Sequence, residues 1–257
     1  MSPDAAQARR ARAALLAVAV LSAAFVLLAP RIPQDPAYHD FADRRPWLGV
    51  PDAGDVLGNL AFLPAGVAGL LALRRRAAAP SPAARTAWAT FFAGVVLTTF
   101  GSGWYHLAPS NERLAWDRLP IALACQGLLC AMIAERLSPR LAARLLVPLL
   151  LFAGGSVAWW AHTEAAGAGD LRAYGVSQFG PALGLVLLAV LAPRRESGRP
   201  DLLWGVIALY AAAKACEALD RPIFAAGGLV SGHTLKHLFA AVAAGWAARA
   251  LWRRVTP

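Results

Sequence analysis

Charged residues are scarce in this chain of 257 residues. Asp, Glu, Lys and Arg make up 16% of it and hydrophobic residues 58%, whereas a soluble domain is about 25% charged and about 45–50% apolar. This shortage of charge excludes an ordinary water-soluble domain. Apolar runs of about 20 residues recur along the whole length, as in transmembrane helices. The sequence therefore predicts an all-α polytopic membrane protein.

Cysteine and acidic residues are also few. The three cysteines, Cys125, Cys130 and Cys216, all lie inside apolar runs, where cysteine commonly serves as a small hydrophobic residue. We therefore expect neither a disulfide nor a cysteine-ligated metal. The 15 acidic residues are outnumbered by 25 basic ones. The arginines lie at the ends of apolar runs instead of forming one basic domain, which indicates membrane topology and excludes nucleic-acid binding.

Eight apolar runs predict eight transmembrane helices. The first run follows a short basic segment, as a signal peptide would. It is long for a signal peptide and has no clear A-x-A cleavage site, so we favour an uncleaved helix. The chain then divides into residues 1–30, with this extra helix, and a seven-helix membrane domain over residues 31–257. The predicted spans are Ala13–Ala29, Val56–Leu73, Thr86–His106, Asp117–Ala134, Leu145–Ala161, Tyr174–Leu191, Leu202–Ala218 and Gly232–Leu251.

The arginines predict how these helices are oriented. Sixteen lie in segments on the N-terminal side and seven on the opposite side. Because cytoplasmic loops are enriched in Lys and Arg, we expect both termini in the cytoplasm. The composition, rich in Ala, Arg and Leu, fits a bacterial inner membrane.

Two polar clusters lie at the outer side of this predicted bundle. The stretch Gly101–Pro120 contains Ser102 and His106 at the end of one span and Asp117 at the start of the next, with Asp117 expected as an N-cap. The segment SGHTLKH opens the last span and contains His233 and His237. These two histidines are four residues apart, so they share one helix face. Each residue alone also has a simpler interpretation as an interfacial, capping or packing residue.

Together these residues predict a metal site. Three histidines leave one tetrahedral position open, which is the pattern of catalytic zinc. Asp117 is expected either to orient a histidine or to act as general base and acid. Ser102 is expected to donate a hydrogen bond to a developing oxyanion.

The motifs GSGWYH, WDRLP and SGHTLKH resemble those of the alkaline ceramidase family, which belongs to a wider group of membrane hydrolases that includes adiponectin-receptor-like proteins. The resemblance covers about residues 38–252. It implies a seven-helix core that holds zinc by three histidines and hydrolyses the amide bond of ceramide. His106, His233 and His237 would then be the ligands, Asp117 would transfer the proton, and Ser102 would support the oxyanion.

Some members of this family bind calcium at an acidic segment before the first core helix. The comparable stretch here contains Asp40, Asp43, Asp52 and Asp55, with Asn59 just inside the next helix, and oxygen ligands suit calcium. Arg44 and Arg45 interrupt the cluster, however, and a solvated acidic loop is the favoured alternative.

We therefore expect a zinc-dependent amide hydrolase of the membrane, acting on ceramide or a related N-acyl lipid, with no obligate protein partner. The alternative is a non-enzymatic membrane receptor or metal-binding protein on the same scaffold. A transporter would require interrupted helices near the bilayer centre, and the sequence indicates none. We also expect Lys214 and Glu217 to neutralise each other and Lys236 to extend its amine to the lipid headgroups.

Overall fold

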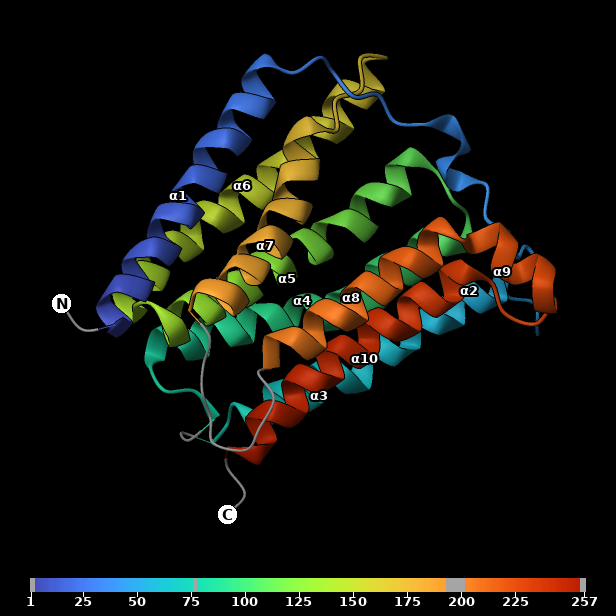
Figure 1. Ribbon diagram of the computed structural model, residues 1–257. Coiled ribbons are helices and arrows are strands. Elements are labelled where there is room, and N and C mark those ends of the chain that lie inside the picture. The colour runs from blue at the N-terminus through green and yellow to red at the C-terminus, as the bar shows by residue number, and fades with distance from the viewer. Residues whose placement is uncertain (1–2, 76–77, 193–201, 255–257) are drawn as a thin grey trace.

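A computed structural model describes residues 3–75, 78–192 and 202–254, and these residues form an all-helical structure (Figure 1). The described residues contain ten α-helices, two short 3-10 helices and no β-strand. The helices are α1 (Pro3–Leu28), η1 (Pro36–His39), α2 (Ala53–Gly58), η2 (Asn59–Ala61), α3 (Phe62–Ala72), α4 (Pro82–Leu107), α5 (Asn111–Arg136), α6 (Pro139–Ala165), α7 (Arg172–Leu191), α8 (Leu202–Ala218), α9 (Asp220–Gly227) and α10 (Gly232–Arg253).

All eight predicted spans fall on helical segments, although several helices extend beyond the predicted bounds and the second span is divided among α2, η2 and α3. One predicted helix start was wrong. The sequence predicted that a helix begins at Asp117, whereas α5 begins at Asn111 with Ser110 as its N-cap. The Ser110 hydroxyl accepts a hydrogen bond from the Arg113 amide and so satisfies a free N–H of the first turn. Asp117 consequently lies inside α5, buried, and Pro120 lies in the helix interior.

Serine residues define the starts of the helices that matter for the site. Ser81 accepts from the Ala84 amide at the start of α4, and Ser231 accepts from the Thr234 amide at the start of α10. Ser138 caps α6 in the same way. Such side-chain caps fix where each helix begins and therefore the direction in which its first side chains point.

Five of the described helical segments are long and apolar enough to cross a membrane: Ala5–Leu28, Ala53–Ala72, Asn111–Arg136, Pro139–Ala165 and Arg172–Leu191. The bent pair α8–α9, with an angle of 76°, gives a sixth if it counts as one span. Helices α4 and α10 have lengths of 26 and 22 residues but do not meet this criterion. They carry the polar residues of the site. The chain therefore has the character of a multi-pass membrane protein.

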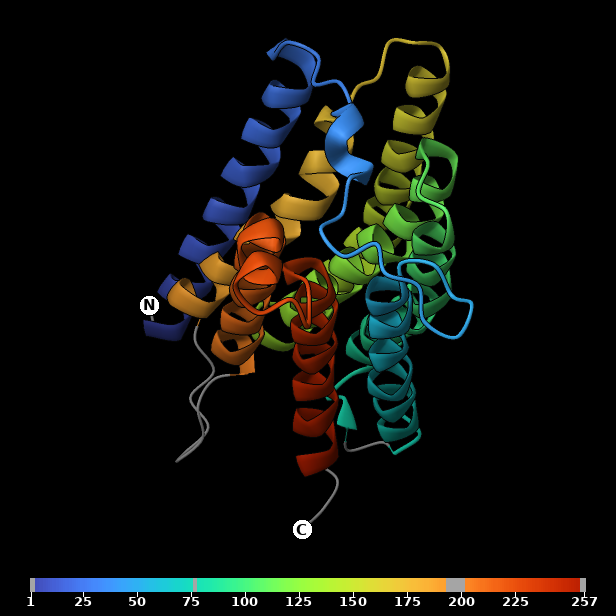
Figure 2. The ribbon, with the colours of Figure 1, turned by 90° about the vertical axis from the view of Figure 1, so that its right-hand side faces the viewer.

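The helices form a bundle in which segments distant in sequence are neighbours. Contacts join α10 to α3, α3 to α4, α4 to α5, α5 to α7, α7 to α8 and α8 back to α10. Helix α6 packs on α5 and α7, and α1 packs on α7. In Figure 2, α10 (red) lies between α8 (orange) and α3 (cyan to teal). The C-terminal helix is therefore enclosed between earlier helices, which brings its histidines against the end of α4.

The arginine-rich segments meet at one end of the bundle. Arg254 forms an ion pair with Glu135 at 2.8 Å and donates to the Ala78 carbonyl. Arg12 donates to the Leu137 carbonyl and Arg136 to the Ala192 carbonyl. This arrangement agrees with the predicted distribution of arginines. Four of the counted arginines, Arg76, Arg194, Arg195 and Arg199, lie outside the described residues.

Separate contacts join the loops at the other end. Arg172 donates to the Ala29 carbonyl, and its ion pair with Asp170 measures 2.7 Å. Hydrogen bonds from the Arg172 side chain lower the pKa of the Asp170 carboxyl to about 2. His39 contacts the Tyr105 hydroxyl and the Asn111 side chain at 2.9 Å each. The segment between α1 and α2 is thereby fixed over the ends of α4 and α5.

Candidate metal centre

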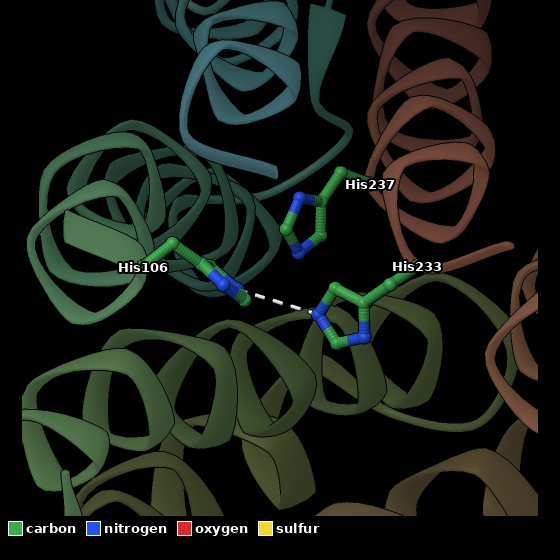
Figure 3. Close-up of side chains that lie close together, drawn as sticks. All are labelled: His106, His233 and His237. Atoms are coloured by element: carbon green, nitrogen blue, oxygen red, sulfur yellow. Dashed lines mark hydrogen bonds between the residues drawn. The ribbon is translucent and has the colours of Figure 1, made fainter. Parts of the chain in front are cut away.

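His106, His233 and His237 come together in the interior of the bundle (Figure 3). One ligand nitrogen from each ring lies within 4.8 Å of those of the other two, and the ring centroids are 4.9, 5.0 and 4.9 Å apart. All three residues are at most 4% exposed. Among the described residues, no other group of three His, Cys, Asp or Glu side chains lies close enough to hold an ion.

Two helix ends bring these rings together. His106 lies in the last turn of α4, whereas His233 and His237 lie in the first two turns of α10. The spacing of four residues places His233 and His237 on one face of α10, as the sequence predicted. Figure 3 shows the His106 ring opposite them.

The separation of one pair of nitrogens fits two ligands of a tetrahedral metal. Nε2 of His106 lies 3.3 Å from Nε2 of His233. At zinc–nitrogen distances of 2.0–2.1 Å, two ligands of a tetrahedral site lie about 3.3–3.4 Å apart. The same separation also permits a hydrogen bond between two neutral rings. The third ring, which faces the other two, distinguishes a ligand set from an isolated histidine pair.

A neighbouring carbonyl orients His237. Nδ1 of His237 lies 3.2 Å from the backbone oxygen of Asp55, so Nε2 is the nitrogen left for a metal. Metal-ligating histidines commonly donate their second N–H to such an acceptor. The Asp55 carboxylate accepts from Thr234 at 2.6 Å and from Ser231 at 3.2 Å. Asp55 therefore joins α2 to the first turn of α10.

Asp220 fixes the other side of the α10 start. Its carboxylate accepts from the His233 amide at 2.8 Å and from the Ala42 amide at 2.9 Å. This contact brings the segment after η1 over the histidines. Phe41 in that segment has its ring centroid 4.7 Å from the His106 ring and 4.4 Å from the His233 ring. The aromatic ring therefore shields the two imidazoles from the outside.

Ser102 and Asp117 form the second element of the site. Ser102 lies one turn before His106 on α4 and is 2% exposed, while Asp117 on α5 is 7% exposed. The Ser102 side chain contributes to the electrostatic environment of the Asp117 carboxylate. The sequence predicted that these two residues would be neighbours of the histidines at one depth; the structure places Ser102 on α4 with His106 and Asp117 on α5, which packs against α4.

Close backbone contact makes this packing possible. A Cβ atom on Gly101 would lie 2.2 Å from the Trp116 carbonyl oxygen, which is far inside van der Waals contact. Only glycine allows α4 and α5 to approach this closely. Gly101 and Trp116 directly precede Ser102 and Asp117, so this contact sets the distance between the two functional side chains.

Lysine residues beside the site are neutralised inside the protein. Glu217 forms ion pairs with both Lys214 and Lys236, the latter at 3.0 Å. The predicted Lys214–Glu217 pair is therefore confirmed. The prediction that Lys236 extends to the headgroups was wrong, because its side chain is 19% exposed and turns inward to Glu217.

A cavity of about 310 Å³ leads to His233. Its wall is formed by the segment after η1 and by the junction of α8 and α9, and it includes Tyr38, Phe41, Glu217, Asp220 and Arg221. An ion pair between Arg221 and Asp40, at 2.5 Å, joins the two walls. The cavity is large enough for a small polar headgroup.

The residues expected to bind calcium are separated into individual ion pairs. Asp40 pairs with Arg221, Asp43 with Arg45 at 2.8 Å, and Asp52 with Arg44 at 3.2 Å. The Asn59 amide donates to the Asp55 carbonyl instead. Hydrogen bonds from Arg45 lower the pKa of Asp43, whereas burial raises the pKa of Asp52. These four residues do not form one ligand set in the structure, and calcium binding remains a prediction.

Sequence reasoning missed Asp55 and Asp220 as supports of the site. Both were visible as acidic residues at predicted helix ends. The partners of Asp55 at the start of α10 are 176 to 182 residues away in the sequence, and the partner of Asp220 is 13 residues away.

Comparison with protein-family models and with curated proteins finds no match to this chain. The possible chemistry of the site therefore follows from its own residues. Three imidazoles can hold a metal, a carboxylate can accept a proton, and a hydroxyl can donate a hydrogen bond to an oxyanion.

Proposed function

We propose that this chain is a zinc-dependent integral-membrane amide hydrolase that cleaves ceramide or a related N-acyl lipid into a fatty acid and an amine. The observation that carries the proposal is the buried His106–His233–His237 cluster, with Ser102 one turn before His106 on α4 and Asp117 buried on the adjacent helix α5. The similarity of the motifs to the alkaline ceramidase family supports the same reaction. In this proposal, residues 31–257 form a ceramidase-like domain of seven transmembrane helices, and α1 is an additional membrane helix.

The donor set suits zinc better than a hard cation. Three imidazole nitrogens without a carboxylate among them match the ligands of catalytic zinc, whereas calcium and magnesium take oxygen ligands. His106 turns its Nε2 toward Nε2 of His233, while its Nδ1 is buried and has no hydrogen-bond partner among the described residues. Zinc held by three histidines supplies a Lewis acid and lowers the pKa of water toward about 7.

The chain's own residues perform the remaining steps. The Asp117 carboxylate accepts a proton from the attacking water and later returns it to the nitrogen of the leaving amine. The Ser102 hydroxyl donates to the carbonyl oxygen as negative charge develops on it. Phe41 covers His106 and His233 and limits the access of bulk water. The cavity beside His233 accepts the polar headgroup of the lipid.

The test combines metal analysis with lipid turnover. We expect purified protein to contain about one zinc ion per chain, as a three-histidine site holds, and to release fatty acid from ceramide in detergent or nanodiscs. His233→Ala should remove both the zinc and the activity, because two imidazoles bind the metal weakly. Zinc content is measured by elemental analysis and fatty acid by mass spectrometry.

His162→Ala is the matched control, because His162 is an exposed histidine near the end of α6. It should retain zinc and turnover. Full activity in His233→Ala would contradict the proposal. Stoichiometric zinc without turnover of any N-acyl lipid would favour the alternative, a membrane receptor or metal-binding protein on the same scaffold.

A further inference from the structure

Arg118 is a buried arginine that forms no ion pair with any acidic side chain that the structure describes. It follows Asp117 on α5 and is 4% exposed. In the described part of the chain its one hydrogen bond runs from Nη2 to the Gln34 side-chain oxygen at 2.6 Å. A buried charge is costly unless it is paired, and an amide oxygen supplies only a partial negative charge.

Three aromatic rings surround the Arg118 guanidinium. Its central carbon lies 4.0 Å from the centre of the Trp160 ring, 4.6 Å from that of Tyr174 and 5.4 Å from that of Tyr38. Aromatic faces stabilise a cation over the ring. They leave the N–H groups in the guanidinium plane without acceptors, so the rings explain how the cation is tolerated but not how its donors are satisfied.

Two of the donors in this cluster have no partner. Nη1 of Arg118 and Nε1 of Trp160 are both buried and form no hydrogen bond to any described residue, and Trp160 is 0% exposed. Both groups can only donate. Because the guanidinium lies against the Trp160 ring, both donors belong to one small region. A ligand that satisfies them must offer at least two acceptor atoms and carry negative charge to balance Arg118.

One ring, that of Tyr38, joins the cluster to the cavity at the candidate metal centre. Tyr38 lines the cavity that reaches His233, and the Arg118 guanidinium lies against the same Tyr38 ring. Asp117 is the neighbouring carboxylate on α5 and attracts the Arg118 charge, but the two side chains form no ion pair among the described residues. Successive residues of an α-helix point about 100° apart, so Arg118 reaches Trp160 and Tyr174 on α6 and α7.

We infer that Arg118 and Trp160 form a subsite for the carboxylate group of a lipid. A carboxylate brings one negative charge and two acceptor oxygens, which match one uncompensated arginine and two free donors. As the substrate of the proposed hydrolase, the lipid would be an N-acyl amino acid. That assignment rests on the proposed function, whereas binding of the carboxylate does not.

Equilibrium binding to metal-free protein tests the subsite without any turnover. N-palmitoylglycine is compared with N-palmitoylglycinamide, which has the same chain but no charge, and palmitate is compared with palmitamide. We expect the protein to bind at least one acid ten-fold or more tightly than its neutral partner. The pair with the larger difference shows whether the carboxylate belongs to an acyl amino acid or to a free fatty acid.

Two substitutions test whether the preference for the acid over the neutral lipid depends on the Arg118 guanidinium and on the Trp160 N–H. Arg118→Gln should remove it and leave binding of the neutral lipid unchanged. Trp160→Phe keeps the ring face but removes the N–H, and should weaken binding of the acid several-fold. If Arg118→Gln does not fold, Trp160→Phe alone provides the test. Equal affinity for acid and neutral lipid, or a preference that survives in the variants that fold, would overturn the inference.

Activity separates this inference from the proposed function. If zinc-loaded protein hydrolyses ceramide and N-palmitoylglycine equally well and Arg118→Gln changes neither rate, the subsite is wrong and the hydrolase stands. If no N-acyl lipid is hydrolysed but the acid is bound through Arg118, the hydrolase is wrong and the subsite stands.

Discussion

The proton transfer proposed for Asp117 can be tested directly by one substitution. Asp117→Asn keeps the size of the side chain but removes its ability to accept and return a proton. We expect kcat for an N-acyl lipid to fall by about 10²–10⁴, the usual contribution of general acid–base catalysis. The bound zinc should remain, because all three histidines are unchanged. The measurement is kcat at saturating substrate together with zinc content.

Ser102→Ala should lower kcat less than Asp117→Asn and leave KM nearly unchanged, because a hydrogen bond to a developing oxyanion acts mainly in the transition state. Ser177→Ala is the control: Ser177 is a fully buried serine on α7 that donates to the Tyr174 carbonyl. A normal kcat in Asp117→Asn would remove Asp117 from the mechanism.

Individual residues also show where sequence reasoning succeeded and where it failed. His233 and His237 were predictable as a pair because helical periodicity alone places residues four apart on one face. Asp117 was expected to cap a helix because aspartate favours that position. Ser110, seven residues earlier, is the actual cap. Both residue types cap helices, and only the packing of α4 against α5 determines which one is buried.

At the scale of helices, the contact between α4 and α5 controls the geometry of the site. Gly101→Ala would place a methyl group 2.2 Å from the Trp116 carbonyl oxygen, so the helices must separate. We expect a loss of about 1–3 kcal/mol of stability, as overpacked cores show. Activity should fall further, because displacement by about 1 Å can lower a rate about 10²-fold. Thermal unfolding and kcat measure the two effects.

Gly103→Ala is a matched control in the same turn, since an added methyl group there meets nothing within 4 Å. It should preserve activity and stabilise α4 slightly, because alanine favours a helix by about 1 kcal/mol over glycine. Equal effects of the two substitutions would contradict the role assigned to the Gly101–Trp116 contact.

The helices themselves were largely predictable, whereas their interruptions were not. Apolar runs located all eight long helical segments, because the length of an apolar run is a local property. Helix α9 and the 3-10 turn η2 between α2 and α3 were not predicted. The environment of Arg118 was not predictable either. It combines Gln34, Trp160 and Tyr174, which come from three separate segments and meet only in the folded bundle.

For the whole molecule, one set of arginine contacts and the candidate metal centre lie toward opposite ends of the bundle. Arginine contacts join the loops at one end, and the candidate metal centre lies toward the other. Helix α6 extends from one end to the other, so its two ends report the orientation in the membrane. Ala143, between Arg140 and Arg144, and Ala166, just after α6, are both exposed.

If the arginine-rich end is cytoplasmic, as the positive-inside rule predicts, intact bacterial cells should label Ala166→Cys with a membrane-impermeant maleimide. Ala143→Cys should be labelled only after the membrane is permeabilised. The unsubstituted protein is the blank, because Cys125, Cys130 and Cys216 all lie within helices that belong to the bundle.

The reverse labelling pattern would place the candidate metal centre toward the cytoplasm. Lipid substrates would then have to reach it from the inner leaflet, since the cavity beside His233 opens at the same end of the bundle as Asp40 and Arg221.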